Sequence, residues 1–128
     1  MTPASIAAIL ATAQDDLLNL RLDAAMAGFD TVLRFLPAQV GALSGRAGVL
    51  HQSRRNEEAL ACLDAALVAE PANPTILRER GEILLELDRA AEALESFERA
   101  LAICEPSSLQ VPALSISTNA GLGLSTNS

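Results

Sequence analysis

An internal repeat of 34 residues constrains the fold of this chain more than any other feature of the sequence. Moved along by one period, the central part of the chain falls on identical residues: Leu43 on Leu77, Arg46 on Arg80, Leu50 on Leu84, Arg55 on Arg89, Glu58 on Glu92, Ala59 on Ala93, Leu60 on Leu94, Ala66 on Ala100 and Leu67 on Leu101. A fainter copy lies upstream, where Ala13, Arg21, Ala25, Asp30, Leu33 and Pro37 precede their counterparts by the same interval. The units occupy about residues 3–37, 40–71 and 74–106. Because a short unit cannot bury its apolar face alone, such units stack against one another.

Each unit predicts two helices separated by a polar turn. In the central unit the apolar residues fall at helical spacings, with Leu43, Ala47 and Leu50 in the first helix and Ala59, Leu60, Leu63, Ala66 and Leu67 in the second. Asn56, which follows the turn, is expected to cap the second helix. Asn73-Pro74 and Thr2-Pro3 each combine a capping residue with a proline at the first helical position, and this combination predicts a helix start.

The composition agrees with an all-α fold and excludes some classes of function. Half of the 128 residues are apolar but only three are aromatic, so alanine and leucine dominate and favour helix. The formal net charge of −7 argues against nucleic acid, whose phosphates are bound by clustered Lys and Arg. No apolar run reaches the roughly 18–20 residues that span a bilayer. The N-terminal residues lack the basic start of an export signal, so a cytoplasmic protein is expected.

The residues that commonly carry chemistry are few and scattered. Cys62 and Cys104 have neither a metal-binding spacing nor a CxxC arrangement, so we expect reduced thiols that are buried or half-buried. His51 is the only histidine, and the sequence places no nucleophile or paired carboxylate beside it. We therefore predict no catalysis, no cofactor and no metal site.

With its helix–turn–helix pattern, the repeat resembles the tetratricopeptide repeat (TPR) family. The matching positions are the small residue of the first helix (Ala13, Ala47, Gly81), the alanine that opens the second helix (Ala25, Ala59, Ala93), the bulky residue four later (Phe29, Leu63, Phe97), the second small site (Val32, Ala66, Ala100) and the closing proline (Pro37, Pro71, Pro106). The third unit looks like a bacterial form of the repeat. The resemblance covers about 105 of the 128 residues. It implies a right-handed α-solenoid of three units, in which each small residue lets a neighbouring helix approach closely.

The family resemblance also implies a binding surface, because such proteins bind peptides on the concave side lined by the first helix of each unit. Carried over position by position, that surface comprises Gln14, Leu17, Leu18, Gly41, Ser44, Gly45, Gly48, His51, Gln52, Arg78, Glu79, Glu82, Leu85 and Glu86. The family's clamp for chaperone carboxylates needs Asn and Lys or Arg where this chain has Gly45 and Glu79, so that specificity is not expected.

Two sets of residues on this surface are open to two interpretations. The acids at positions 79, 82 and 86 share one helix face and form either a solvated face or an acidic wall. Gly41, Gly45 and Gly48 also share one face, although each glycine costs a helix interior about 1 kcal/mol relative to alanine. They either accommodate packing or form a smooth trough for a peptide backbone.

Two arginines occupy the same repeat position inside otherwise apolar helices. Arg46 and Arg80 either bind an anionic partner or pair with acids of the preceding helix. Asp30 and Asp64 lie at the same distance before them in the sequence, and this equal spacing favours the pairs.

After Pro106 the repeat pattern stops. Residues 108–128 have no helical period and no charge, which predicts an extended or disordered tail. Its larger apolar residues begin with the alternating set Leu109, Val111, Leu114 and Ile116. No polar capping helix follows the last unit, so Phe97, Leu101 and Ile103 are expected to be partly exposed. The tail either covers that surface, enters a groove of its own or another copy, or is disordered.

Taken together, these features predict a protein-interaction scaffold that binds a peptide or segment of a partner protein on its first helices. Self-association through the tail or the uncapped last helix is a further expected interaction. The alternatives are a helical appendage of a larger enzyme, such as a transferase, and a small chaperone of the same family, which would need a hydrophobic groove.

Overall fold

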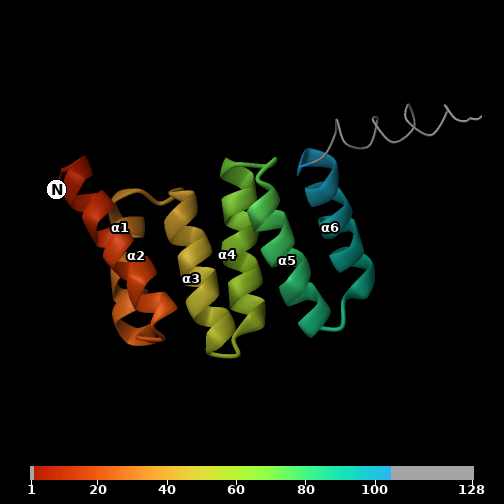
Figure 1. The fold of residues 1–128 in the computed structure, drawn as a ribbon, viewed down its shortest axis with the longest axis horizontal. Helices are drawn as coiled ribbons and strands as arrows, with labels where there is room; N and C mark the ends of the chain where they lie inside the picture. Colours follow the sequence, from red (N-terminus) through yellow and green to blue (C-terminus); the bar gives the residue numbers. More distant parts are fainter. Residues whose placement is uncertain (1, 105–128) are drawn as a thin grey trace, which may run out of the picture.

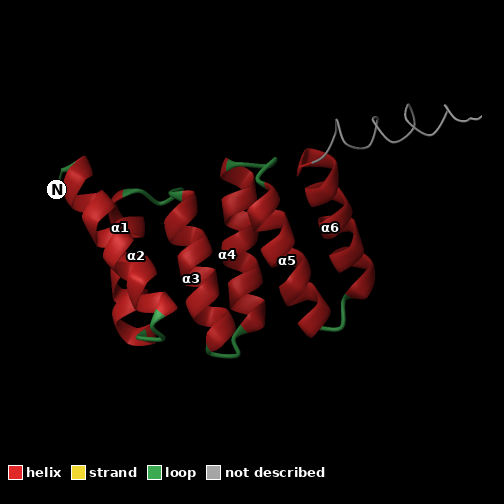
Figure 2. Cartoon of the chain, in the orientation of Figure 1, coloured by secondary structure: helices red, strands yellow, loops and turns green. Residues whose placement is uncertain are grey.

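The computed structural model describes residues 2–104, which form six α-helices and, within that range, no strand (Figure 2). The helices are α1 (Pro3–Leu18), α2 (Leu22–Phe35), α3 (Val40–Gln52), α4 (Asn56–Ala69), α5 (Pro74–Glu86) and α6 (Ala90–Cys104). The helix pairs follow one another along the long axis of the molecule, so that α1 and α6 stand at opposite ends (Figure 1). The all-α solenoid that the repeat predicts is confirmed. The expectations for residues 108–128 lie outside the described residues.

Side-chain caps start the first helix of each pair. Thr2 Oγ1 and Asn73 Oδ1 each accept a hydrogen bond from the backbone N–H three residues later, at 3.1 and 3.2 Å, as their Xaa-Pro sequences predicted. Gln39 caps α3 in the same way, with its Oε1 atom 2.7 Å from the backbone nitrogen of Ala42. No described helix is long and apolar enough to cross a membrane.

The turn inside each pair is a left-handed cap that recurs at the repeat interval. Leu20, Arg54 and Asp88 have φ values of 59°, 64° and 61°. The arginine that follows each of them donates its backbone N–H to the carbonyl five residues earlier, at 2.8, 2.8 and 2.9 Å. Together with the hydrogen bond from each left-handed residue to the carbonyl three residues earlier, this is the Schellman arrangement. It reverses the chain while satisfying the last carbonyls of the first helix.

This turn places the cap of α4 one residue earlier than predicted, so the prediction that Asn56 caps the helix is wrong. Arg55 is the cap residue, and its side chain makes no capping hydrogen bond. The Schellman bonds already position the backbone for α4 at Arg55, so that its carbonyl accepts the first helical hydrogen bond, from Ala59 at 3.0 Å. Asn56 is therefore the first helical residue, and its Nδ2 atom donates to Glu86 Oε1 at 3.2 Å.

Small and bulky residues at the repeat positions form the core. Ala25, Ala59 and Ala93 are completely buried, and so are Phe29 and Leu63. Fully burying a side chain of the size of leucine or phenylalanine contributes about 1.5–3 kcal/mol relative to exposure. Because these side chains are buried between helices, the close approach that the alanines permit is what stabilises the stack.

Ion pairs join each second helix to the first helix of the next pair. Arg46 Nε lies 3.0 Å from Asp30 Oδ1, and Arg80 Nε lies 2.7 Å from Asp64 Oδ1. Both predicted pairs are confirmed, and their partly exposed positions limit each to about 0–1 kcal/mol. Arg46 Nη1 also donates to the thiol of Cys62, at 3.0 Å.

The two cysteines differ in exposure. Cys62 is buried, as expected, whereas Cys104 is exposed, so the expectation of a buried or half-buried thiol is wrong for Cys104. Cys104 is the last residue of α6, and among the described residues no later helix packs on the outer side of α6. Its exposure follows from that position at the end of the stack.

Candidate binding groove

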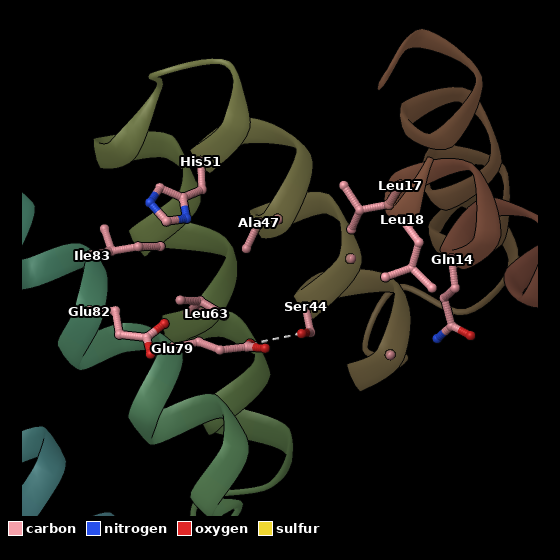
Figure 3. A pocket seen from close by; sticks show the side chains of 13 residues that line it. Gln14, Leu17, Leu18, Ser44, Ala47, His51, Leu63, Glu79, Glu82 and Ile83 are labelled. Carbon is pink, nitrogen blue, oxygen red and sulfur yellow. Dashed lines mark hydrogen bonds between the residues drawn. The ribbon is translucent and has the colours of Figure 1, made fainter. Parts of the chain in front are cut away.

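A pocket of about 390 Å³ opens along α3, with α1 on one side and α5 on the other. We call this pocket the central groove. It is lined by Gln14, Leu17, Leu18, Gly41, Ser44, Gly45, Ala47, Gly48, His51, Leu63, Glu79, Glu82 and Ile83. Figure 3 shows the α1 side chains opposite those of α5, with Ser44 reaching across toward Glu79. The first helices of all three pairs thus contribute to one hollow.

The structure brings together most of the residues that the family resemblance assigned to the binding surface. Those in the central groove are Gln14, Leu17, Leu18, Gly41, Ser44, Gly45, Gly48, His51, Glu79 and Glu82. Four others lie elsewhere. Gln52 and Glu86 line an adjoining polar pocket, and Arg78 lines an apolar pocket against α6. Leu85 is 52% exposed and lies outside these three pockets.

Three further residues line the groove that the family resemblance did not assign to it: Ala47, Leu63 and Ile83. All three are almost completely buried, and they supply apolar surface to the groove from beneath. Their helical spacing marks them as core residues. Nothing in that spacing indicates that one side of a core residue also meets a pocket.

Two side-chain contacts cross from α3 to α5, seven residues apart on each helix. Ser44 Oγ donates to Glu79 Oε1 at 2.9 Å, and His51 Nε2 lies 2.7 Å from Glu86 Oε2. The Asn56 amide donates to the other oxygen of Glu86. These contacts hold α3 and α5 at a fixed separation beside the groove.

The three acids of α5 have different surroundings, which their shared helix face did not predict. Burial raises the pKa of Glu79, and the hydrogen bond from Ser44 and the charge of Arg78 only partly oppose this rise. Glu82 is exposed and lies 3.3 Å from Arg78 Nη1. The hydrogen bond with His51 lowers the pKa of Glu86. A solvated face therefore describes Glu82 and Glu86 but is wrong for the half-buried Glu79.

Packing explains why α3 has a glycine at position 45, where the side chain would be buried. A Cβ atom added at Gly45 would overlap the ring of Phe29, which α2 directs against this point of α3. At Gly48 the added atom would lie 2.9 Å from Leu17 Cδ2, the end of a flexible side chain. The packing interpretation therefore holds for Gly45.

Comparison with known protein families identifies the repeat. The family model for the tetratricopeptide repeat matches residues 46–115, more than half of the chain. The chain belongs to the tetratricopeptide repeat family. No curated protein sequence matches this TPR chain.

Solved TPR structures have the same fold. The first TPR of Spaghetti (RPAP3), bound to the HSP90 peptide SRMEEVD, has a TM-score of 0.76 and 15% identity, over 91% of this chain and 95% of that one. The first TPR domain of human RPAP3 has a TM-score of 0.76 and 16% identity, over 89% and 92% of the two chains. MamA AMB-1 has a TM-score of 0.71 and 18% identity, and the alignment covers 85% of this chain but 60% of that chain. At these identities the likeness establishes the fold of the TPR chain.

Proposed function

We propose that this TPR chain is a protein-interaction scaffold whose central groove binds an extended segment of a partner protein through a basic side chain. The observation that carries the proposal is the pocket along α3, which combines an apolar floor with two acidic side chains, Glu79 and Glu82. A further support is the similar fold of the RPAP3 domain, whose structure contains a bound peptide.

The charge of the groove determines the kind of segment that it accepts. Glu79 is half-buried and its pKa is raised by burial, so its carboxylate is poorly solvated and gains from a cation nearby. Arg78 is the nearest basic group in α5, and its Nη1 atom turns to Glu82. A lysine or arginine of the partner, placed between the two acids, would add a second positive charge to that of Arg78. The chaperone-carboxylate clamp is not proposed, because Gly45 occupies the position of its amide residue and Glu79 the position of its cationic residue.

Apolar contacts complete the proposed site. Leu17 and Leu18 of α1 line the groove opposite the acids, and Leu18 is 82% exposed. Successive side chains of an extended segment point to opposite sides, so a basic residue with apolar residues at the adjacent positions meets both walls. The family's repeats are typically non-catalytic interaction modules, and the scaffold requires no chemistry from His51.

A degenerate peptide library tests the proposal. The library carries all residue types at each of several positions and is selected on the immobilised full chain. We expect enrichment of Lys or Arg at one position, with apolar residues at the adjacent positions. The double variant Glu79→Gln/Glu82→Gln should lose that enrichment, whereas Glu98→Gln, an exposed acid on α6, should keep it.

The affinities of individual peptides measure how much the basic residue contributes to binding. For the best peptide, replacing the basic residue with Gln should weaken binding about three- to tenfold, as expected for a partly desolvated ion pair of about 0.7–1.4 kcal/mol. The weakening should shrink at high salt. Selection of acidic residues, or equal enrichment by the wild type and the double variant, would refute the assignment of the groove.

A further inference from the structure

The outer side of α6 exposes residues that are covered in the preceding pair. Leu94 and Leu101 are 59% and 58% exposed. Their counterparts one repeat earlier are Leu60, which is 6% exposed, and Leu67, which packs against the core. The difference arises because the following helix, α5, packs on α4, whereas no helix follows α6 in the described part of the chain.

This exposed side contains a pocket. Its volume is about 400 Å³, and it lies between the C-terminal half of α6 and the start of α5. Phe97, Leu101 and Cys104 of α6 line it together with Pro74 and Arg78 of α5. We call this surface, with the adjacent Leu94, the α6 face. The chain leaves α6 at Cys104, directly beside the pocket.

The two earlier connections show where the chain goes after a second helix. Residues 36–39 connect α2 to α3, and residues 70–73 connect α4 to α5, and in both cases the following helix returns over the one before it. The same number of residues after Cys104 ends at residue 108. The family match continues beyond α6 to residue 115, as it would if the next segment belonged to the stack.

We propose that residues 109–116 of this chain dock on its own α6 face. This segment, LQVPALSI, has four large apolar side chains and no charge, so it matches an apolar surface. Pro112 lacks a backbone N–H and disfavours helix, so the segment docks as an extended strand-like stretch in place of a further helix. Twelve residues beyond Cys104 reach about 40 Å when extended, against about 22 Å for the length of α6, so the face is within reach.

The α1 end of a second copy is a poorer candidate to cover the α6 face. The exposed residues of α1 include Ala4, Ala8 and Ala11, which bury little apolar area against leucine side chains. Docking of the tail within one chain is therefore favoured over head-to-tail stacking of two copies.

Paramagnetic relaxation enhancement on the full chain tests the docking. Cys104→Ser with Ser115→Cys leaves one accessible thiol for a spin label, because Cys62 is buried. We expect the label to reduce the amide signals of residues 93–101 and of the start of α5, with no change on dilution. Adding Leu101→Ser should abolish the effect, whereas adding Leu18→Ser, at an exposed leucine of α1, should not.

The remaining outcomes overturn the proposal. If the label affects no described residue, the segment does not dock. An effect seen only between spin-labelled and isotope-labelled molecules in a mixed sample identifies a second copy as the occupant. An effect on the central groove instead of α6 identifies that groove as the docking site. Circular dichroism of each variant establishes that the helices are intact.

Discussion

Replacing Gly45 with alanine should lower the free energy of unfolding, although alanine is the better helix former. Gly45 lies inside α3 and is buried. A Cβ atom at this position would overlap the ring of Phe29, which is completely buried and has no solvent-facing side toward which to move. The ring or the helix must therefore shift.

Two opposing terms set the magnitude. Removing a glycine from a helix interior gains about 1 kcal/mol. Overpacking a well-filled core costs about 1–3 kcal/mol, and the enclosed ring places this site toward the upper end. The net effect expected for Gly45→Ala is a loss of about 1–2 kcal/mol. Gly48→Ala is the matched control on the same helix. Because it meets only the end of the Leu17 side chain, it should be neutral or stabilising.

Urea unfolding followed by far-ultraviolet circular dichroism measures these differences, since the chain has no Trp or Tyr for fluorescence. A double-mutant cycle with Phe29→Leu isolates the contact. Phe29→Leu alone should destabilise by leaving a cavity, but it should cost less in the Gly45→Ala background because it relieves the overlap. The reasoning is refuted if Gly45→Ala matches or exceeds the wild type in stability, or if the two changes add within about 0.5 kcal/mol.

Three further predictions concern the turns, the groove and the last pair. Leu20→Gly should raise the free energy of unfolding by about 0.5–1 kcal/mol, because glycine adopts the left-handed turn conformation without strain; thermal melting measures this. Glu79→Gln should stabilise the protein at pH 7. Because the folded-state pKa of Glu79 is raised, the wild type loses stability as the pH rises from about 4.5 through that pKa, so the advantage of the variant should vanish below pH 4.5 in a pH series of urea titrations. Ser96→Ala should cost about 1 kcal/mol, because the buried Ser96 hydroxyl donates to the Leu77 carbonyl at 2.7 Å; Ser96→Cys, a control of similar size with a weaker donor, should fall in between.

The repeat in the sequence determined the helical stack and many of the contacts between its helices. Asn73 and its proline mark a helix start by local chemistry alone, because the cap bonds a neighbouring N–H. Arg46 and Asp30 were paired from their equal spacing with the next such pair, because a stacked repeat reproduces each contact once per unit. The candidate groove residues of α1 and α3 came from the family resemblance, which implies that the first helices line one side of the stack.

Only the tertiary structure decided the features that depend on a neighbouring helix. Leu20 and Arg54 are not residues that favour a left-handed conformation, and the hydrogen bonds that close the turn impose it. Glu79 and Glu82 look alike in the sequence, yet Glu79 is half-buried and hydrogen-bonded to Ser44 of α3, whereas Glu82 is exposed. Burial is a property of what packs on a residue, and a periodic pattern specifies the face of a helix but not how closely its neighbour approaches.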